Sequence, residues 1–318
     1  MKQNIIYKLN NELRLDKFLK QELPEFSRTK IQQYIKSGII KVDGYNIKSS
    51  YLLKLNQIIS LDDNILLNNE ESLLPENMML NILHEDDHII VINKKAGIVV
   101  HPGIGNKNGT LLNGVLHHCS NLSDFNGRPG VIHRLDKGTS GVIIFAKTDK
   151  AHYHISEQFA NRSIKKKYLA IIWGNIDTSI NIDGYINRDP KNRLKFKLFS
   201  NKGKFSSSRI KLVSNYDLPV SVVEVYPETG RTHQIRVHLS HLGHPILKDD
   251  LYNGGDKIIT SFHQKYKLEL GKIVNLIDRV ALHANEIEFI HPENNKKINF
   301  IAPIPKDFCN VYNFLNEE

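Results

Sequence analysis

Cysteine is scarce in this chain of 318 residues. Only Cys119 and Cys309 are present, far apart and without a Cys-x-x-Cys motif, so neither a disulfide framework nor a redox-active pair is expected. No apolar run approaches the length of a membrane span, and residues 1–10 lack the pattern of a secretory signal. We therefore expect a cytoplasmic protein that does not enter a membrane.

Nucleotide-binding motifs are also missing, since the sequence contains neither a Gly-x-Gly-x-x-Gly fingerprint nor a P-loop. What is present is positive charge: 43 Lys and Arg residues against 34 Asp and Glu give a net charge of +9. Such a balance favours a polyanionic partner, most simply nucleic acid, although many soluble proteins are mildly basic. The length suggests about two domains.

The most informative segment of the chain is residues 133–141, with the sequence HRLDKGTSG. An apolar run at 142–147 follows it and is typical of a buried strand. Asp136 lies between Arg134 and Lys137, and a carboxylate among cations is normally held ionised. An ionised carboxylate can attack carbon or accept a proton. The alternative is a surface turn in which Asp136 forms ordinary ion pairs.

Residues 133–141 resemble the catalytic signature of the RluA-type pseudouridine synthases, which isomerise uridine in RNA. Further blocks resemble the same family in the family's order; they are residues 92–97, 100–103, 230–238 and 281–292. The resemblance implies a mixed sheet with the active site in a central cleft. It also implies a reaction without a cofactor, because no atoms enter or leave when uridine becomes pseudouridine.

The resemblance assigns Asp136 as the catalytic carboxylate. Its chemical role stays open: it could attack ribose C1′, attack uracil C6, or remove a proton from the ribose. Tyr168 follows three lysines where the family has its active-site tyrosine, and would stack on the flipped uracil or handle protons. The apolar neighbours of Tyr168 equally suit a tyrosine in the core of a strand.

Three further residues have implied roles in substrate binding. Arg231 would pair with Asp136, or it could bind a backbone phosphate as a turn arginine after Gly230. Arg134 would enter the RNA at the place that the flipped uridine leaves. Leu282 would line the base pocket, although any buried strand leucine has the same pattern.

The N-terminal segment 13–61 reads as a compact unit with two amphipathic helices and a strand at 39–44 that ends in an Asp-Gly turn. Ser27 is a candidate N-cap of the second helix. The unit resembles the S4 RNA-binding module, whose second helix presents basic side chains to phosphates. Here these would be Arg28, Lys30 and Lys36, which could alternatively form only a solvated helix face.

The fold class expected is α+β, with a small S4-like α/β domain followed by a mixed, mainly antiparallel sheet. Residues 62–81 read as a linker, so we expect an S4-like domain and linker at 1–75 and a catalytic domain at 76–318. The expected strands and helices of the catalytic domain follow from β-rich runs and apolar spacing. The strands are 89–93, 142–147, 168–173, 222–226 and 286–290; the helices are 111–118 and 152–161.

A basic stretch at 188–197 has no clear counterpart in the family. The spacing of its cations, with apolar residues between them, predicts a strand with one cationic face. The cations are Arg188, Lys191, Arg193, Lys195 and Lys197. We interpret it as a contact for RNA phosphates. The alternative is a solvated sheet edge whose charges prevent aggregation.

Three other functions require comparison. A metal-dependent hydrolase would need ligands, but the spacing of His233, His238, His241 and His244 does not match H-E-x-x-H, so we expect loop histidines and no metal. A glycosidase would normally need two carboxylates at a defined separation, and only Asp136 carries a signature. A non-catalytic RNA-binding or ribosome-assembly protein is the third alternative.

The segments 101–106 and 109–113 resemble those S4-bearing family members that act on a stem-loop of large-subunit ribosomal RNA. We therefore expect ribosomal RNA as the partner, with another ribosomal site or transfer RNA as the alternative. We further expect a monomer without a bound metal.

Overall fold

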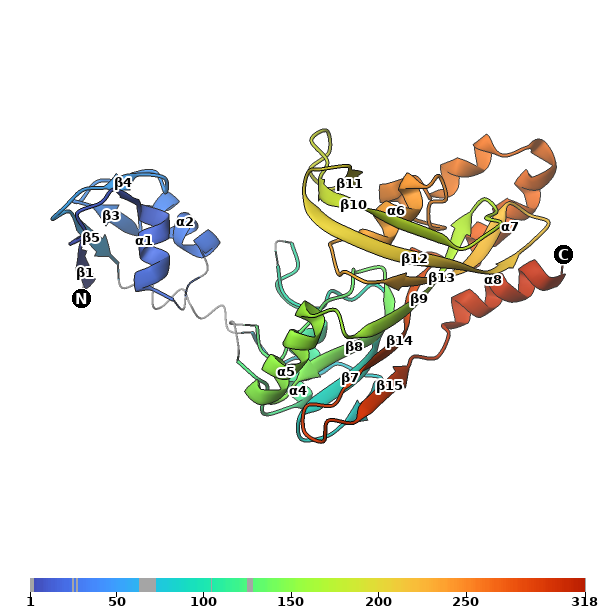
Figure 1. The fold of residues 1–318 in the computed structure, drawn as a ribbon, viewed down its shortest axis with the longest axis horizontal. Helices are drawn as coiled ribbons and strands as arrows, with labels where there is room; N and C mark the ends of the chain where they lie inside the picture. The colour runs from blue at the N-terminus through green and yellow to red at the C-terminus, as the bar shows by residue number, and fades with distance from the viewer. Residues whose placement is uncertain are drawn as a thin grey trace. The chain divides into compact units, whose positions relative to one another are not determined.

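The computed structural model describes residues 3–24, 26, 28–62, 73–103, 105–124 and 128–317. The chain divides into two compact units, Met1–Leu73 and Leu74–Glu318 (Figure 1). Each unit has a hydrophobic core of its own, so each is described by itself.

The N-terminal unit combines two helices with short strands. Its elements are β1 (Gln3–Ile6), β2 (Leu13–Arg14), α1 (Leu15–Glu22), α2 (Arg28–Lys36), β3 (Ile40–Val42), β4 (Leu52–Leu53) and β5 (Ile58–Leu61). The strands form a β1-β5-β3 sheet and a β2-β4 pair. The expected Asp-Gly turn follows β3, where Asp43 and Gly44 both have positive φ, as a two-residue turn requires.

The predicted phosphate contacts of α2 have different outcomes. Arg28 donates to the carboxylate of Asp16 at 2.8 Å, and Asp16 is fully buried. Arg28 therefore holds α2 against α1, although its side chain is half-exposed. Lys36 is exposed in the last turn of α2. Ser27 and the side chain of Lys30 lie outside the described residues.

The second unit is built on one large mixed sheet, which runs β11-β10-β12-β13-β9-β14-β8-β7-β6, with β15 paired to β14. Only the β14–β8 pair is parallel among the described strands, so the sheet is mainly antiparallel, as expected. The strands are β6 (Ile82–Glu85), β7 (Ile89–Lys94), β8 (Ser140–Ala146), β9 (Lys165–Trp173), β10 (Ile180–Arg188), β11 (Phe196–Phe199), β12 (Lys204–Asn215), β13 (Val220–Pro227), β14 (Leu282–Ile290) and β15 (Lys297–Ile301).

The sequence underpredicted the helices of this unit. The expected helices are present as α4 (Leu111–His118) and α5 (Asp149–Ala160), and the structure adds α6 (Gln234–His241), α7 (Lys267–Asn275) and α8 (Lys306–Glu317). Residues of α6, α7 and α8 pack into one core with β9, β10, β12 and β13, whereas α5 shares a second core with β7 and β8. No described helix has the length and apolarity that crossing a membrane requires.

The predicted linker at 62–81 extends too far toward the C-terminus. Residues 63–72 lie outside the described residues, but the segment after them bonds to the region around α4. The carbonyl of Leu74 accepts a hydrogen bond from Asn113, and the carboxylate of Glu76 accepts one from the backbone N–H of Gly109. Residues 74–81 are therefore part of the second unit.

The basic stretch 188–197 is a hairpin, so the prediction of a single strand was wrong. β10 ends at Arg188 and β11 begins at Phe196. Between them the side chain of Asp189 accepts from the N–H of Lys191, and that of Asn192 accepts from the N–H of Leu194. Such side-chain bonds stabilise turns in place of a continuous strand.

Gly141 permits the parallel contact between β8 and β14. Its φ is +112°, and a Cβ at this position would lie 2.1 Å from the carbonyl oxygen of Ala284. A side chain at position 141 would push β8 and β14 apart. The glycine is therefore required by packing as well as by backbone conformation.

We expect Gly141→Ala to lower the free energy of unfolding by about 3 kcal/mol or more. Gly97→Ala is the matched control, because Gly97 also has positive φ but a Cβ there would meet nothing within 4 Å. It should cost only the backbone strain of about 1–2 kcal/mol. Urea denaturation of the two variants checks this, and equal losses of stability would contradict the packing role.

Candidate active site

A cavity of about 400 Å³ lies where the 133–141 segment, β9, the start of β14 and α6 meet. All five site residues predicted for the catalytic domain line it: Arg134, Asp136, Tyr168, Arg231 and Leu282. They come from segments almost 150 residues apart in the chain, and the sheet brings them together.

The loop that carries Asp136 is fixed at both ends. The N–H of Thr139 donates to the carbonyl of Asp136, and the N–H of Gly97 donates to the carbonyl of Lys137. At the other end, His133 Nε2 accepts from the N–H of Ile144 in β8 at 3.0 Å. Burial lowers the pKa of His133 to about 3, so the ring is neutral and can accept this bond.

The carboxylate of Asp136 faces Arg236, not Arg231. Arg236 Nη1 lies 3.3 Å from Asp136 Oδ2, and His233 Nε2 lies 3.9 Å from the same oxygen. The side chain of Asp136 is 21% exposed, which leaves it open to the cavity. A charge-assisted bond in a partly dehydrated site fixes the orientation of a carboxylate.

The predicted pairing of Arg231 with Asp136 is therefore wrong in this structure. Arg231 Nε donates to the carbonyl of Phe205, and the backbone N–H of Arg231 donates to the side chain of Gln234. Arg231 precedes the left-handed residue His233, whereas Arg236 lies in the first turn of α6. Arg231 remains at the cavity wall, partly exposed, where it can meet a phosphate.

Tyr168 and Leu282 lie on neighbouring strands and both line the cavity: Tyr168 of β9 pairs with Ala284 of β14, two residues after Leu282. Burial, helped by the charge of Asp136, raises the pKa of Tyr168 well above its usual range, so its hydroxyl stays protonated. Leu282 is buried. Together they give the cavity one aromatic and one aliphatic surface.

A buried lysine and a partly exposed lysine add positive charge. Lys94, at the end of β7, is 1% exposed and donates to the carbonyls of Lys95 and Ile98. Burial lowers the pKa of Lys94 to about 7, against the opposing attraction of Asp136. Lys166 lines the cavity, and burial lowers its pKa to about 8. The ammonium group of Lys166, which the cavity reaches, would gain stability beside an incoming phosphate.

The clustered histidines do not form a metal site and are not all in loops. His238 is fully buried in α6 and bonds to Ser206 and Ser208. His244 contacts the carbonyl of Trp173, and His233 contacts the hydroxyl of Tyr252. Among the described residues, these histidines belong to no group that could hold an ion.

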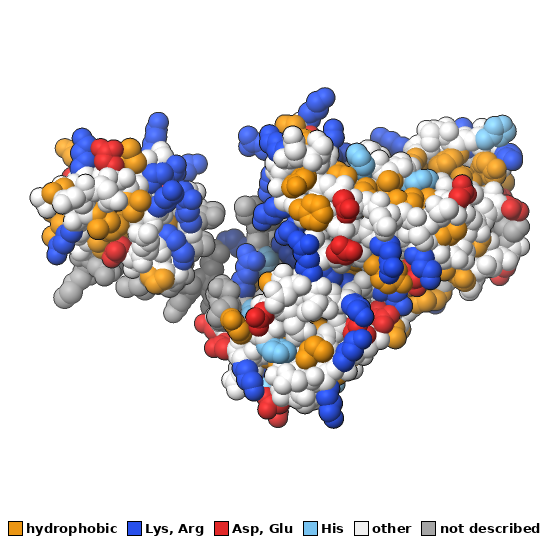
Figure 2. Space-filling view, in the orientation of Figure 1, with side chains coloured by type: hydrophobic (Ala, Val, Ile, Leu, Met, Phe, Trp, Pro, Cys, Tyr) orange, Lys and Arg blue, Asp and Glu red, His pale blue; other side chains and the backbone are white. Residues whose placement is uncertain are grey.

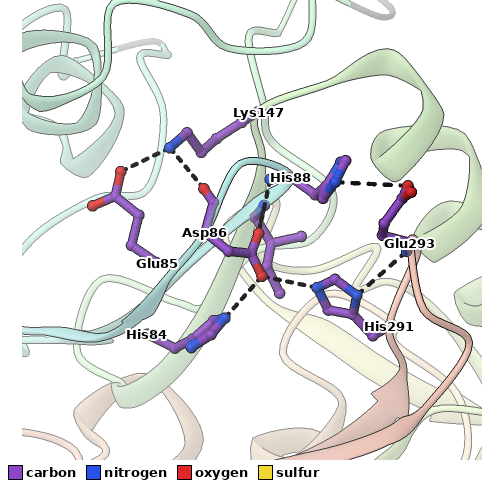
Figure 3. Close-up of polar contacts among 8 residues, drawn as sticks. His84, Glu85, Asp86, His88, Lys147, His291 and Glu293 are labelled. Atoms are coloured by element: carbon purple, nitrogen blue, oxygen red, sulfur yellow. Dashed lines mark hydrogen bonds and ion pairs between the residues drawn. The ribbon is translucent and has the colours of Figure 1, made fainter.

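One group of potential ligands exists elsewhere, formed by Glu85, His118 and Cys119. The ammonium of Lys147 already lies 2.9 Å from Glu85 (Figure 3). Burial and the neighbouring Glu85 raise the pKa of the Cys119 thiol to about 11, so the thiolate that a metal needs is disfavoured. We assign this group a structural role.

Beside it, Asp86 closes the turn between β6 and β7. Its carboxylate accepts from His84, from His291 and from the backbone N–H groups of His88 and Ile89 (Figure 3). Burial opposes ionisation, but these bonds outweigh it and hold the pKa of Asp86 well below its usual range. The cluster ties the end of β14 to the edge of the sheet.

Comparison with known proteins identifies the chain. Residues 88–241 match the model of the RNA pseudouridylate synthase family, and residues 13–59 match the S4 domain. The ribosomal large subunit pseudouridine synthase D of Xanthomonas campestris pv. campestris is 37% identical over 96% of this chain and 89% of that protein. The chain belongs to the RNA pseudouridylate synthase family.

Other relatives agree. The protein with the same name from Neisseria meningitidis serogroup B is 38% identical over 96% of this chain and 79% of its own length. The solved structure of human RNA pseudouridylate synthase domain containing 4 matches with a TM-score of 0.54 and 25% identity, covering 74% of this chain and 93% of that one. The enzyme is thus an RNA pseudouridine synthase, and its partner is RNA. Family membership decides against a glycosidase and a metal-dependent hydrolase.

Sequence reasoning missed three residues around Asp136: Lys94, His233 and Arg236. Arg236 and His233 both lie in the 230–238 block, and Lys94 lies in the 92–97 block. The resemblance identified the segments that form the site, but it did not show which side chain in each segment contacts Asp136.

We expect Arg236→Gln to lower the rate of pseudouridine formation at saturating enzyme by at least about 100-fold. The reason is that Asp136 then lacks its charged partner. Arg231→Gln is the matched control and should weaken RNA binding several-fold while leaving the saturated rate near that of wild type. Single-turnover assays with chromatography of the digested nucleosides measure both. The reverse pattern would restore Arg231 as the partner of Asp136.

Proposed function

We propose that this enzyme isomerises uridine in large-subunit ribosomal RNA, with Asp136 as the catalytic carboxylate. The observation that carries the proposal is the cavity, in which Tyr168 and Leu282 lie beside the open carboxylate of Asp136. The target follows from relatives named for the large ribosomal subunit, which cover most of this chain. Another ribosomal site or a transfer RNA is the alternative target.

The reaction needs a base removed from its stack and held against Asp136. Pseudouridine formation breaks the bond between uracil N1 and ribose C1′, turns the base, and joins C5 to C1′. Tyr168 would cover one face of the uracil, and Leu282 would pack against it. The Arg236 guanidinium would keep Asp136 ionised for attack on C1′ or C6, or for removal of a ribose proton.

Arg134 and Lys166 would handle the RNA around the flipped base. Arg134 is exposed and lines the cavity two residues before Asp136. From there it could occupy the gap in the RNA stack, which offsets part of the cost of base flipping. Lys166 and Arg231 line the same cavity and would meet the neighbouring phosphates.

The hairpin between β10 and β11 extends this cationic surface. Arg188, Lys191, Arg193 and Lys197 are exposed, and among the described residues none of them forms an ion pair. In Figure 2, Lys and Arg side chains gather at this end of the second unit and in the hollow next to it. Unpaired surface cations beside a substrate cavity suit a nucleic-acid backbone. We propose that the hairpin contacts RNA phosphates.

Asp136→Asn tests the catalytic assignment, because it keeps the size of the side chain and removes its charge. We expect no detectable pseudouridine in a ribosomal RNA transcript, with RNA binding within about 3-fold of wild type, because phosphate contacts supply most of the affinity. Asp87→Asn is the control and should be fully active, because Asp87 is exposed and does not line the cavity. Turnover by Asp136→Asn would overturn the assignment.

The division of labour between the two units is a further part of the proposal. Removing residues 1–73 should weaken binding to long ribosomal RNA and make binding less dependent on salt. The slope of log binding constant against log salt concentration should become shallower by about 0.7–0.9 for each phosphate that the shortened protein no longer neutralises. The remaining unit should still modify a short stem-loop at high concentration. Removing residues 1–81 is the control: it also takes away Glu76 and its bonds, so it should lower the melting temperature. Unchanged affinity and slope after removal of residues 1–73 would exclude an RNA-docking role.

A further inference from the structure

The guanidinium of Arg236 is held by a second carboxylate. Arg236 Nε and Nη2 donate to the two oxygens of Asp249 at 2.7 and 2.8 Å, a bidentate pair. Only Nη1 is left over, and it is the atom that faces Asp136 at 3.3 Å. A planar guanidinium gripped on one edge presents the remaining N–H groups in a fixed direction. The orientation of Arg236 toward Asp136 therefore follows from its bond to Asp249.

Asp249 is itself held by burial and by hydrogen bonds. It is fully buried, and its carboxylate also accepts from the N–H of Tyr252 at 3.3 Å. Its backbone carbonyl accepts from the N–H groups of Tyr252 and Gly254. A Cβ at Gly254 would lie 1.8 Å from the carbonyl oxygen of Ile246, so this turn packs tightly against the preceding segment. The rigid turn fixes where the carboxylate lies.

Tyr252 encloses the arginine from another side. The Arg236 guanidinium lies 4.9 Å from the centre of the Tyr252 ring, and the Tyr252 hydroxyl accepts from the N–H of Phe196. That hydroxyl also lies 2.8 Å from His233 Nδ1. If it donates there, the ring proton of neutral His233 is on Nε2, the atom nearest to Asp136. The same turn thus supports both neighbours of Asp136.

We infer that Asp249 is a positioning residue for the isomerisation: it orients Arg236 so that the guanidinium reaches Asp136. Asp249 does not line the cavity, so it acts through Arg236 and not on the substrate. The inference rests on the proposed function, because it takes Asp136 as the catalytic carboxylate. Asp249 and Asp136 bind the same guanidinium, and the buried Asp249 sets the direction in which that guanidinium meets Asp136.

The experiment is a double-mutant cycle with Asp249→Asn and Arg236→Gln, measured in single turnover over a range of enzyme concentrations. An asparagine places an N–H₂ donor against one arginine N–H, which breaks the bidentate pair. We expect Asp249→Asn to lower the saturated rate by about 10- to 100-fold, with half-saturation changed by less than about 2-fold. On the Arg236→Gln background the same change should have no further effect, because nothing is left to position.

Asp250→Asn is the matched control, since Asp250 is the adjacent carboxylate in the same turn but is exposed. It should leave the rate unchanged. If Asp249→Asn does not fold, as judged by circular dichroism and thermal unfolding, Asp249→Ser takes its place in the same cycle. A wild-type rate for the Asp249 variant, or penalties that multiply in the double variant, would overturn the inference.

The assay also distinguishes failure of the proposed function from failure of the positioning role. Wild-type enzyme that forms no pseudouridine, or an Asp136→Asn variant as active as wild type, would refute the proposed function. Active wild type with an inactive Asp136→Asn variant, together with a fully active Asp249→Asn variant, would refute only the positioning role.

Discussion

The bond between Arg236 and Asp136 joins two parts of the chain that are 100 residues apart in sequence. Its geometry requires the large sheet to hold α6 and the 133–141 segment at a fixed separation. Each neighbouring feature serves this requirement: His133 anchors the loop to β8, and Asp249 fixes the far side of the guanidinium. A single ion pair next to an open cavity thus explains much of the local architecture.

The sheet itself is constrained where β8 and β14 run parallel. Close approach of these strands requires Gly141, and it brings the Asp136 loop next to Leu282. β9 pairs with the other edge of β14 and supplies Tyr168. The cavity therefore forms at the centre of the sheet, where residues from the two hydrophobic cores meet. Such a position combines a rigid frame with access for a large RNA.

The sequence predicted the cavity residues but not all of their contacts. Arg134, Asp136, Tyr168, Arg231 and Leu282 were found because their motifs occur in the order of a known family. The choice between Arg231 and Arg236 depends on where α6 begins, and that start depends on the left-handed backbone of His233. No periodicity in residues 230–238 indicates this conformation, so the sequence alone left the pairing open to error.

Other differences have equally local causes. Alternating Leu194, Phe196 and Leu198 looked like one strand, but Asp189 and Asn192 bond to backbone N–H groups and form a turn. Composition suggested a linker up to residue 81, whereas Glu76 bonds to Gly109 across more than thirty residues. Sequence patterns predict local structure from adjacent residues. They do not predict hydrogen bonds that depend on the tertiary fold.

The most direct measurement of the central claim is a map of pseudouridines in the ribosomal RNA of cells that lack this enzyme. The account predicts that one or a few sites in the large-subunit RNA lose pseudouridine. It also predicts that a plasmid copy of the wild-type enzyme restores them and that the Asp136→Asn variant does not. Unchanged large-subunit RNA in the deletion strain, or restoration by Asp136→Asn, would contradict it.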